Sequence, residues 1–418
     1  TNETVGIQHP ANTVSRGSIN ILTNSGAVVA VLCRLSNENR ANWMSDLHRL
    51  YAITHSLYSG RARAYLIKQG IPFQELSTGH ESFKAEVLPK GKLATIPTLV
   101  TPEGEVIRDG AAIIEHFESL NGRPSQPLGA CQQIISALFD VIGSDGLLRP
   151  AMHYRWNYPE ENLHFVRYHF LHSQRDTPER ADKTEYMMNR MRHVAQVFGV
   201  TEQSQTLVEE LYLEYLEALN KHFEQYPYLL GWKPCVGDFG LLAPMYAHLG
   251  RDPHPACLMQ QRAPRVYRWV ERMNRADQDA PEYFMAGTDF LKNDEVPETL
   301  LAVLRVLSED FIPETRAAAA CINDWLAQEK PEAGAPAVGR LANPLGSGEF
   351  TLRTKTITAL AQPYRFYLLQ RVQAIYASLP VSSQASVEQM LKACGFQEVL
   401  SIKLDRGLVR SGNLEVWI

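Results

Sequence analysis

The order of strand-like and helix-like segments between residues 50 and 122 constrains the fold more than any other feature of the sequence. Short runs of β-branched and aromatic residues predict strands, and longer runs with helical periodicity predict helices. The segments lie at 50–54 (strand), 61–69 (helix), 71–76 (strand), 82–88 (helix), 94–100 and 106–108 (a strand pair) and 111–117 (helix). This βαβ(α)ββα order, with a right-handed crossover in its βαβ unit, predicts a thioredoxin-like α/β domain at 48–122.

The rest of the chain divides into three further segments. From Cys131 onward apolar residues recur at helical spacing, which predicts an all-helical domain at 128–284. Residues 1–43 show little periodicity and are expected to form a disordered or loosely attached arm, with Met44 as a more natural start. Residues 285–418 are expected to form a small extra α+β region of unknown role. Its predicted elements are helices at 297–307, 313–328, 363–379 and 387–394, and strands at 349–357, 399–404 and 408–418.

Composition argues against several classes of partner. The net charge of −5, without a long run of lysine and arginine, leaves no electrostatic footprint for a nucleic acid. The apolar run Ala27–Cys33 has seven residues, far short of the ~20 that cross a bilayer, so no membrane association is expected. The six cysteines are scattered and form no CxxC pair, which is typical of a reducing compartment. We therefore expect a soluble, cytoplasmic protein.

Four short motifs follow one another along the chain. They are the serine-bearing turn His55–Arg63, the tripeptide Thr95–Pro97, the segment Asp109–Ile113 and the tripeptide Gly237–Phe239. In this order they resemble landmarks of the glutathione transferase superfamily. The first is similar to the active-site turn of serine-type, zeta- and omega-like members, and the second to the family's cis-proline turn. The resemblance covers somewhat over half of the chain. It implies glutathione as co-substrate, a small electrophilic molecule as second substrate, and a homodimer.

Ser56 lies where the first strand meets the first helix, a place that suits anion chemistry. The N–H groups and the dipole of a helix N-terminus stabilise negative charge. A hydroxyl that donates to a thiolate lowers the pKa of the thiol. The resemblance therefore implies that Ser56 is the catalytic donor to the glutathione sulfur. Tyr58 and Ser59 are alternatives for that role and further candidates for glutathione contacts, and a serine here can also serve only as a helix cap.

Two further motifs supply the contacts expected for the rest of glutathione. The resemblance implies a cis bond at Pro97 and pairing of the Ile96 backbone with the cysteinyl part, as in an added strand. An ordinary trans turn is the alternative. Asp109 is expected to bind the glutamyl ammonium, or else only to cap the next helix. Gly110 stands where the family usually has serine, and the lost hydrogen bond to a charged group corresponds to about 1.5–3 kcal/mol.

Two polar groups of the helical domain have simpler interpretations. Asp238 is assigned to folding. Because Cys235 occupies the usual Ser/Thr cap position and a thiol is a poor acceptor, Asp238 must find other N–H partners. His169 and His172, spaced i,i+3 on a helix, could bind a metal. No nearby carboxylate or cysteine pattern supports this, and no metal site is expected.

Aromatic residues cluster in two places. Tyr154, Trp156 and Tyr158 either line a co-substrate pocket or pack in the core. The helix expected at 363–379 is rich in aromatic residues and is most simply a core-packing face. Its aromatic side chains are Tyr364, Phe366, Tyr367 and Tyr376.

Two classes of function compete. The first is an enzyme, a glutathione transferase or a glutathione-dependent isomerase or reductase, in which Ser56 stabilises a thiolate that attacks an electrophile. The second is a non-catalytic relative that uses the fold to bind a ligand or another protein. Gly110, Cys235 and the extra C-terminal region favour the second class. Retention on immobilised glutathione would distinguish the two, whereas the electrophile cannot be identified from the fold.

Overall fold

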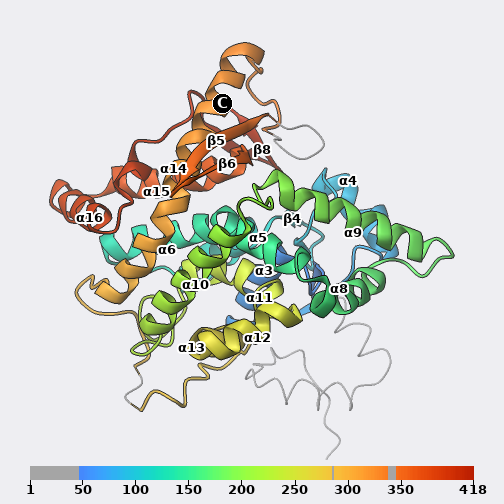
Figure 1. The fold of residues 1–418 in the computed structure, drawn as a ribbon, viewed down its shortest axis with the longest axis horizontal. Coiled ribbons are helices and arrows are strands. Elements are labelled where there is room, and N and C mark those ends of the chain that lie inside the picture. The colour runs from blue at the N-terminus through green and yellow to red at the C-terminus, as the bar shows by residue number, and fades with distance from the viewer. Residues whose placement is uncertain (1–46, 285–286, 338–344) are drawn as a thin grey trace, which may run out of the picture. The chain divides into compact units, whose positions relative to one another are not determined.

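The computed structural model describes residues 47–284, 287–337 and 345–418 (Figure 1). Contacts between Cα atoms divide the chain into two units, Thr1–Ser45 and Asp46–Ile418. The arm expected at 1–43 lies outside the described residues. In the part of the chain that the structure describes, no helix combines the length and the apolar character needed to cross a membrane.

A four-stranded mixed sheet forms the first part of the described chain. Its strands are β1 His48–Tyr51, β2 Phe73–Leu76, β3 Thr98–Val100 and β4 Val106–Arg108, in the spatial order β2-β1-β3-β4. β1 and β2 are parallel, whereas β3 is antiparallel to both β1 and β4. Leu50 and Leu99, paired across β1 and β3, are fully buried. The thioredoxin-like sheet predicted from the sequence is confirmed.

Helices pack on this sheet and complete its βαβ and ββα units. They are α3 Leu57–Lys68, the π-helix η1 Phe83–Val87, α4 Leu88–Gly91 and α5 Gly110–Leu120. α3 starts directly after Ser56, four residues before the helix expected at 61–69, where the sequence favours a turn. Leu57 is buried and Gly60 packs closely on the Tyr246 side chain, so tertiary packing outweighs the turn preference of this stretch. α3 ends just before Gly70, whose φ of +64° is one that glycine adopts readily.

An all-helical part follows, as the sequence predicts (Figure 1). Its elements are α6 Ala130–Val141, the π-helix η2 Ile142–Gly146, α7 Leu148–Trp156, α8 Pro159–Ser173, α9 Arg180–Val197, α10 Gln205–His222, α11 Val236–Ala247, α12 Pro253–Arg262 and α13 Pro264–Met273. α11 packs against both α3 and α6, and nearly all of its residues are buried. It therefore joins the helical part to the sheet-bearing part. The domain limits of 48–122, 128–284 and 285–418 stay predictions.

Asp238 anchors the start of α11 in the core. Its Oδ2 accepts a hydrogen bond from the Cys235 N–H (2.9 Å), and its Oδ1 accepts from the Leu229 N–H (3.1 Å) and the Trp269 indole N–H (3.0 Å). The Cys235 thiol accepts from the Asp238 N–H in return, which closes a capping box. The expectation that Asp238 finds other N–H partners is confirmed, and the residue is a folding element.

The additional region begins with one long helix. α14 Glu298–Glu329 has 32 residues and runs through Pro313, so the prediction of two separate helices at 297–307 and 313–328 is wrong. A proline inside a helix removes one backbone hydrogen bond. Here the buried face continues on both sides of Pro313, and α14 packs along α10, so tertiary contacts carry the helix through the proline. The buried residues next to the proline are Phe311, Ile312, Glu314 and Thr315.

Hairpins and shorter helices complete the additional region. They are β5 Ser347–Leu352, β6 Lys355–Leu360, α15 Pro363–Ser378, α16 Val381–Ala393, the 3₁₀ helix η3 Gln397–Leu400, β7 Leu408–Ser411 and β8 Leu414–Trp417. The strand expected at 399–404 is wrong. The expected strand at 408–418 instead folds back on itself at Gly412, where φ is +60°, and pairs β7 with β8. Similarly, the strand expected at 349–357 is divided between β5 and β6, which pair with each other.

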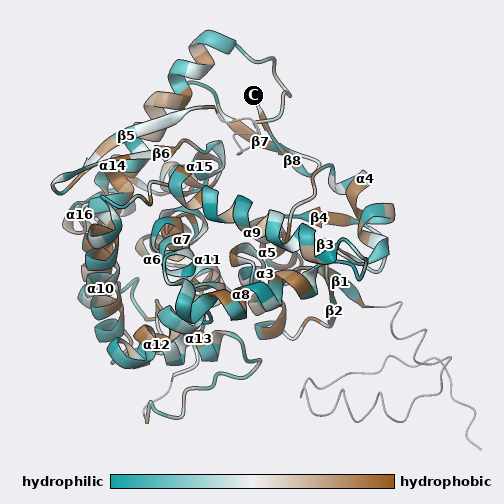
Figure 2. Cartoon of the chain, turned by 45° about the vertical axis from the view of Figure 1, so that its right-hand side comes forward, coloured by the Kyte–Doolittle hydropathy of each residue, from teal (hydrophilic) through white to brown (hydrophobic). Residues whose placement is uncertain are grey.

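The β7–β8 hairpin covers the edge of the four-stranded sheet (Figure 2). An edge strand leaves backbone N–H and C=O groups unpaired. The Asn413 side chain takes the place of a further strand: it accepts from the Arg108 N–H and donates to the Val106 carbonyl, both at 2.9 Å. The Arg108 guanidinium donates to both carboxylate oxygens of Glu415, at 2.9 and 2.7 Å. The additional region is thus attached directly to β4.

A second buried charge network attaches the additional region to the helical part. Arg365 of α15 pairs with Asp145 of η2 and, at 2.8 Å, with Glu314 of α14. Arg149 of α7 pairs with Asp310 at 2.6 Å and with Glu314 at 3.2 Å. Glu314 therefore stands between two guanidinium groups, which outweigh burial and lower the pKa of its carboxyl. Elements from three parts of the sequence share one network of compensated charges.

Breaking the Arg108–Glu415 pair should destabilise the protein far more than breaking an exposed pair of the same kind. The side chains of Arg108 and Glu415 are only 4% and 10% exposed. Glu415→Gln leaves a buried guanidinium without its counter-charge, and we expect a loss of about 3–5 kcal/mol in the free energy of unfolding. The control Glu398→Gln removes the partner of Arg316, where the side chains are 41% and 60% exposed, and should cost less than about 1 kcal/mol. Equal small losses in urea denaturation would contradict this.

The Asp238 carboxyl should make stability fall as pH rises through the weakly acidic range. Burial raises the pKa of Asp238 to about 6 from an ordinary 3.8, although its N–H donors favour the carboxylate. As pH rises, the folded state keeps this proton longer than the unfolded state does. The stabilisation that the protonated carboxyl gives to the fold is therefore complete below about pH 4 and lost by about pH 6, which changes the free energy of unfolding by about 3 kcal/mol. The difference in unfolding free energy between the wild type and Asp238→Asn should shrink by this amount from pH 4 to pH 7. A constant difference would refute the assignment.

Candidate functional site

One cavity brings together most of the residues predicted to bind the ligand. Its volume is about 540 Å³, and Ser56, Tyr58, Ile96, Pro97 and Asp109 lie in its wall. The other two predicted residues, Ser59 and Gly110, do not line it. The wall also includes residues of the helical part and of the additional region. The cavity is therefore the candidate site.

Ser56 lies at the start of α3, and its hydroxyl forms no hydrogen bond within the described residues. Its backbone is extended (φ −82°, ψ 125°), and although it holds the cap position its side chain makes no capping hydrogen bond. Among the described residues the hydroxyl has no other hydrogen-bond partner either, and the residue is only partly buried. A free hydroxyl at the positive end of a helix dipole can donate to an anionic ligand atom in the cavity.

The two alternatives to Ser56 have different environments. Ser59 is fully buried, and its Oγ accepts from the Ile53 N–H at 3.4 Å, which ties the first turn of α3 to the start of the loop that follows β1. This hydroxyl is used inside the protein. Tyr58 is 38% exposed and lines the cavity beside Ser56. Of the two, Tyr58 has the better position for a ligand contact.

Two arginines of the helical part hold the loop that presents Ser56. Arg155 of α7 donates to the His55 carbonyl at 2.8 Å and is held by both carboxylate oxygens of Asp252, at 2.6 and 2.9 Å. Arg251 donates to the Thr54 carbonyl at 2.7 Å. Burial and the Arg155 guanidinium lower the pKa of His55 well below 6.5, so its imidazole is neutral at pH 7. The sequence did not indicate His55 or Arg155 as site residues, yet both line the cavity.

The loop before β3 offers unpaired backbone groups to the cavity. The Ile96–Pro97 peptide bond is cis, as expected. In the described part of the chain neither the N–H nor the carbonyl of Ile96 forms a hydrogen bond, and both residues line the cavity. Backbone groups next to a strand that have no partner can pair with a peptide ligand as an added strand does.

Asp109 has partners from two distant parts of the chain. Its Oδ1 accepts from the Ala111 N–H at 2.9 Å and so caps α5, one of the two roles considered from the sequence. Its Oδ2 accepts from the hydroxyl of Tyr364, the second residue of α15. Tyr364 packs against the core, as expected, and it also lines the cavity. The two residues are 255 positions apart, so no local pattern could indicate their contact.

Position 110 has no room for a side chain because the buried side chain of Arg61 lies against it. A Cβ atom at this position would come within 2.6 Å of Cδ of Arg61. Arg61 passes this point to pair with Asp140 and Ser144 at the junction of α6 and η2. A serine at position 110 would displace Arg61 from these partners. Packing therefore explains why glycine replaces the serine expected from the resemblance.

Apolar side chains of the helical part form another stretch of the cavity wall. Of the aromatic cluster considered from the sequence, Trp156 lines the cavity, whereas Tyr154 is buried in contact with the rings of Tyr158 and Tyr212. Each of the two earlier interpretations thus holds for part of the cluster. A wall of this kind suits an apolar organic molecule. Its members from α7, α8 and α9 and the turn after them are Leu148, Met152, Trp156, Phe170, Met187, Met191, Val194 and Phe198.

The two histidines considered as metal ligands have other partners. His169 contacts Arg251 through Nε2 (3.2 Å) and Thr54 through Nδ1 (3.5 Å), and burial together with Arg251 lowers its pKa to about 4. The His172 Nδ1 lies 3.1 Å from an Arg180 nitrogen. Within residues 47–284, 287–337 and 345–418, no group of three or more His, Cys, Asp and Glu residues could hold a metal ion.

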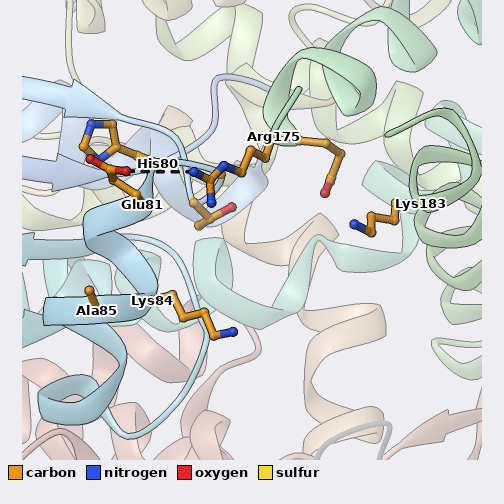
Figure 3. A pocket seen from close by; sticks show the side chains of 9 residues that line it. His80, Glu81, Lys84, Ala85, Arg175 and Lys183 are labelled. Carbon is orange, nitrogen blue, oxygen red and sulfur yellow. Dashed lines mark ion pairs between the residues drawn. The ribbon is translucent and has the colours of Figure 1, made fainter. Parts of the chain in front are cut away.

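A second hollow, of about 550 Å³, shares no residue with the first (Figure 3). Charged side chains surround it, including Lys84, Arg175 and Lys183. Its ion pair between Arg175 and Glu81 is long, at 3.8 Å, and the two side chains are 66% and 78% exposed. Exposed charges of this kind interact weakly. None of the predicted ligand-binding residues lies in this hollow.

Comparisons with known proteins identify the two parts of the fold. The family described as glutathione S-transferase, N-terminal domain, matches residues 50–125. The family described as glutathione S-transferase, C-terminal domain, matches residues 180–277. A search of curated proteins found no match. The first match covers the four-stranded sheet with α3 and α5, and the second covers α9 to α13.

Solved structures similar to this chain include two glutathione transferases and a beta-etherase. A glutathione transferase from Phanerochaete chrysosporium is 13% identical and covers 56% of this chain and 98% of its own, with a TM-score of 0.39. A beta-etherase from Sphingobium sp. strain SYK-6 is 15% identical, covering 56% and 97%, with a TM-score of 0.38. A glutathione S-transferase from Methylobacterium radiotolerans, in complex with glutathione sulfonate, is 16% identical, covering 58% and 99%, with a TM-score of 0.34. Because both family domains match in the order that the fold requires, the chain belongs to the glutathione S-transferase superfamily and carries an additional C-terminal region.

Proposed function

We propose that this protein is a glutathione transferase in which the glutathione thiolate, stabilised by Ser56, attacks a small electrophilic molecule. The observation that carries the proposal is the Ser56 hydroxyl at the start of α3, in the wall of the cavity, which has no hydrogen-bond partner in the part of the chain that the structure describes. Membership of the superfamily supports glutathione as the thiol. The apolar wall formed by residues such as Met152 and Trp156 supports an apolar electrophile.

The proposed reaction uses the protein to position the reactants and to stabilise one charge. The Ser56 O–H donates to the sulfur, and the dipole of α3 favours its negative charge, so the thiol pKa falls below its ordinary value of about 8.5. The thiol proton leaves to solvent and the sulfur forms a bond to the electrophilic carbon. The electrophile accepts the electron pair by releasing a leaving group or by later protonation.

The other contacts to glutathione follow the expected pattern. We assign the backbone of Ile96, beside Pro97, to the cysteinyl part, and Asp109 to the glutamyl end. Tyr58 is a further contact because it lines the cavity next to Ser56. Ser59 acts indirectly by holding the first turn of α3.

The cytoplasm is the setting that suits this chemistry. The cysteines of the described chain are free, and Cys257 is exposed. Exposed free thiols persist in reducing compartments, where glutathione itself is kept reduced. We therefore propose a cytoplasmic location.

Ser56→Ala should damage the reaction and leave the fold nearly intact. The variant removes a donor to the developing thiolate, which typically corresponds to about a hundred- to thousand-fold in turnover. Because the Ser56 side chain makes no capping bond, its removal should barely change the thermal midpoint. Rates with a panel of electrophiles and thermal unfolding, measured on one preparation, test both statements.

Ser59→Ala is the matched control. It removes the buried acceptor of the Ile53 N–H and should lower stability by about 1–3 kcal/mol while keeping most of the activity of the folded enzyme. An unchanged conjugation rate in Ser56→Ala would contradict the catalytic role proposed for Ser56. In that case Tyr58 becomes the next candidate for the donor.

We also propose a homodimer, the usual assembly for transferases of this fold. The additional region already covers β4 and packs on α6, so the pairing must use other faces. Light scattering at micromolar concentration should give a particle of twice the chain mass of 47.1 kDa. A particle of one chain mass would rule out the dimer without bearing on Ser56.

A further inference from the structure

The additional region builds the Asp109 end of the cavity. Tyr364, at the start of α15, donates its hydroxyl hydrogen to Asp109 Oδ2. The Arg410 Nη1, on β7, lies 3.9 Å from the same oxygen. Tyr364, Leu414 and Glu415 all lie in the cavity wall. A ligand that reaches this end therefore meets side chains that lie outside both family domains.

The Asp109 carboxylate is already satisfied by its own chain. Oδ1 accepts from the Ala111 N–H at 2.9 Å, and Oδ2 accepts from Tyr364. Burial opposes the charge on Asp109, but the Arg410 and Arg61 guanidinium groups outweigh it and lower the pKa of the carboxyl. The group is thus ionised at pH 7, and its charge is balanced by cations. Such a carboxylate attracts a further cation only weakly.

Two effects disfavour the binding of an ammonium group at Asp109. It has to displace the Tyr364 hydroxyl, whose hydrogen bond to a carboxylate is charge-assisted and strong. It also comes close to the positive charges of Arg410 and Arg61, in a part of the protein where burial limits screening. A ligand with no cation at this position meets neither effect.

We propose that Tyr364 competes with the amino group of the ligand for Asp109, so that the site prefers thiol ligands that lack a free α-amine. The inference rests on the proposed function, because it takes Ser56 as the place where the thiol binds. It gives a role in ligand selection to the additional region, whose role the sequence left open. Tyr364 acts on the ligand through Asp109, and it is therefore a positioning residue.

Two tripeptides separate this effect from general damage to the site. They are glutathione and glutaryl-cysteinyl-glycine, which is the same molecule without the α-amine. The wild type should bind glutaryl-cysteinyl-glycine about ten-fold more tightly than glutathione. In Tyr364→Phe the affinity for glutathione should rise about ten-fold, because Asp109 loses its competing donor. The affinity for glutaryl-cysteinyl-glycine should not change. Isothermal titration calorimetry on the full chain measures all four constants.

Tyr367→Phe is the matched control on the same helix. Its ring lies 5.9 Å from that of Tyr364, but Tyr367 is absent from the cavity wall. It should bind both tripeptides as the wild type does. Thermal midpoints of both variants report any loss of folding, which would lower both affinities together and leave their ratio unchanged.

The outcomes distinguish this inference from the proposed function. If both tripeptides bind to the wild type and Tyr364→Phe does not change the ratio of their affinities, the competition for Asp109 is wrong and the thiol site stands. If neither tripeptide binds to the wild type or to any variant, the thiol site itself is wrong. Glutathione binding that appears only in Tyr364→Phe would support the competition in its strongest form.

Discussion

The buried pair between Arg108 and Glu415 is the interaction on which the position of the additional region depends. Arg108 ends β4 and directly precedes Asp109, so the pair that holds the β7–β8 hairpin also holds the chain next to the site. Asn413 completes the attachment by pairing with the backbone of β4. A buried ion pair contributes little net stability, but it favours one arrangement strongly because each misplaced charge would be left uncompensated. The same contact therefore closes the sheet edge and brings Tyr364 within reach of Asp109.

Guanidinium groups from distant segments hold the other end of the cavity as well. Arg155 and Arg251 bind the carbonyls of His55 and Thr54, and Asp252 holds Arg155 in place. The loop before α3 is thus positioned by the helical part, while the Ser56 hydroxyl that it presents stays unpaired among the described residues. A donor that is oriented in advance and not used inside the protein is suited to a charge that develops on a ligand. At this site the scaffold and the chemistry are supplied by different residues.

Prediction from the sequence succeeded where local signals decide the structure. The strands of the sheet and the end of α3 near Gly70 follow short motifs, whereas the cis bond at Pro97 was expected from the family resemblance. It failed where packing overrides a local signal. Pro313 does not end α14, because the buried face of the helix continues on both sides of the proline and the helix packs on α10. The expected strand at 399–404 is also absent, because β8 takes its partner from the residues just before it, across the turn at Gly412.

The sequence by itself determined the order of the sheet-bearing and helical parts and the place of Ser56 at a helix start. These features depend on periodicity and turn chemistry within about twenty residues. Only the tertiary structure decided that the Arg61 side chain requires a glycine at position 110 and that the Tyr364 hydroxyl donates a hydrogen bond to Asp109. The second contact joins residues 255 positions apart. Its geometry comes from buried charges and packed faces that the chain brings together only when it folds, and no local pattern in the sequence records which of them will meet.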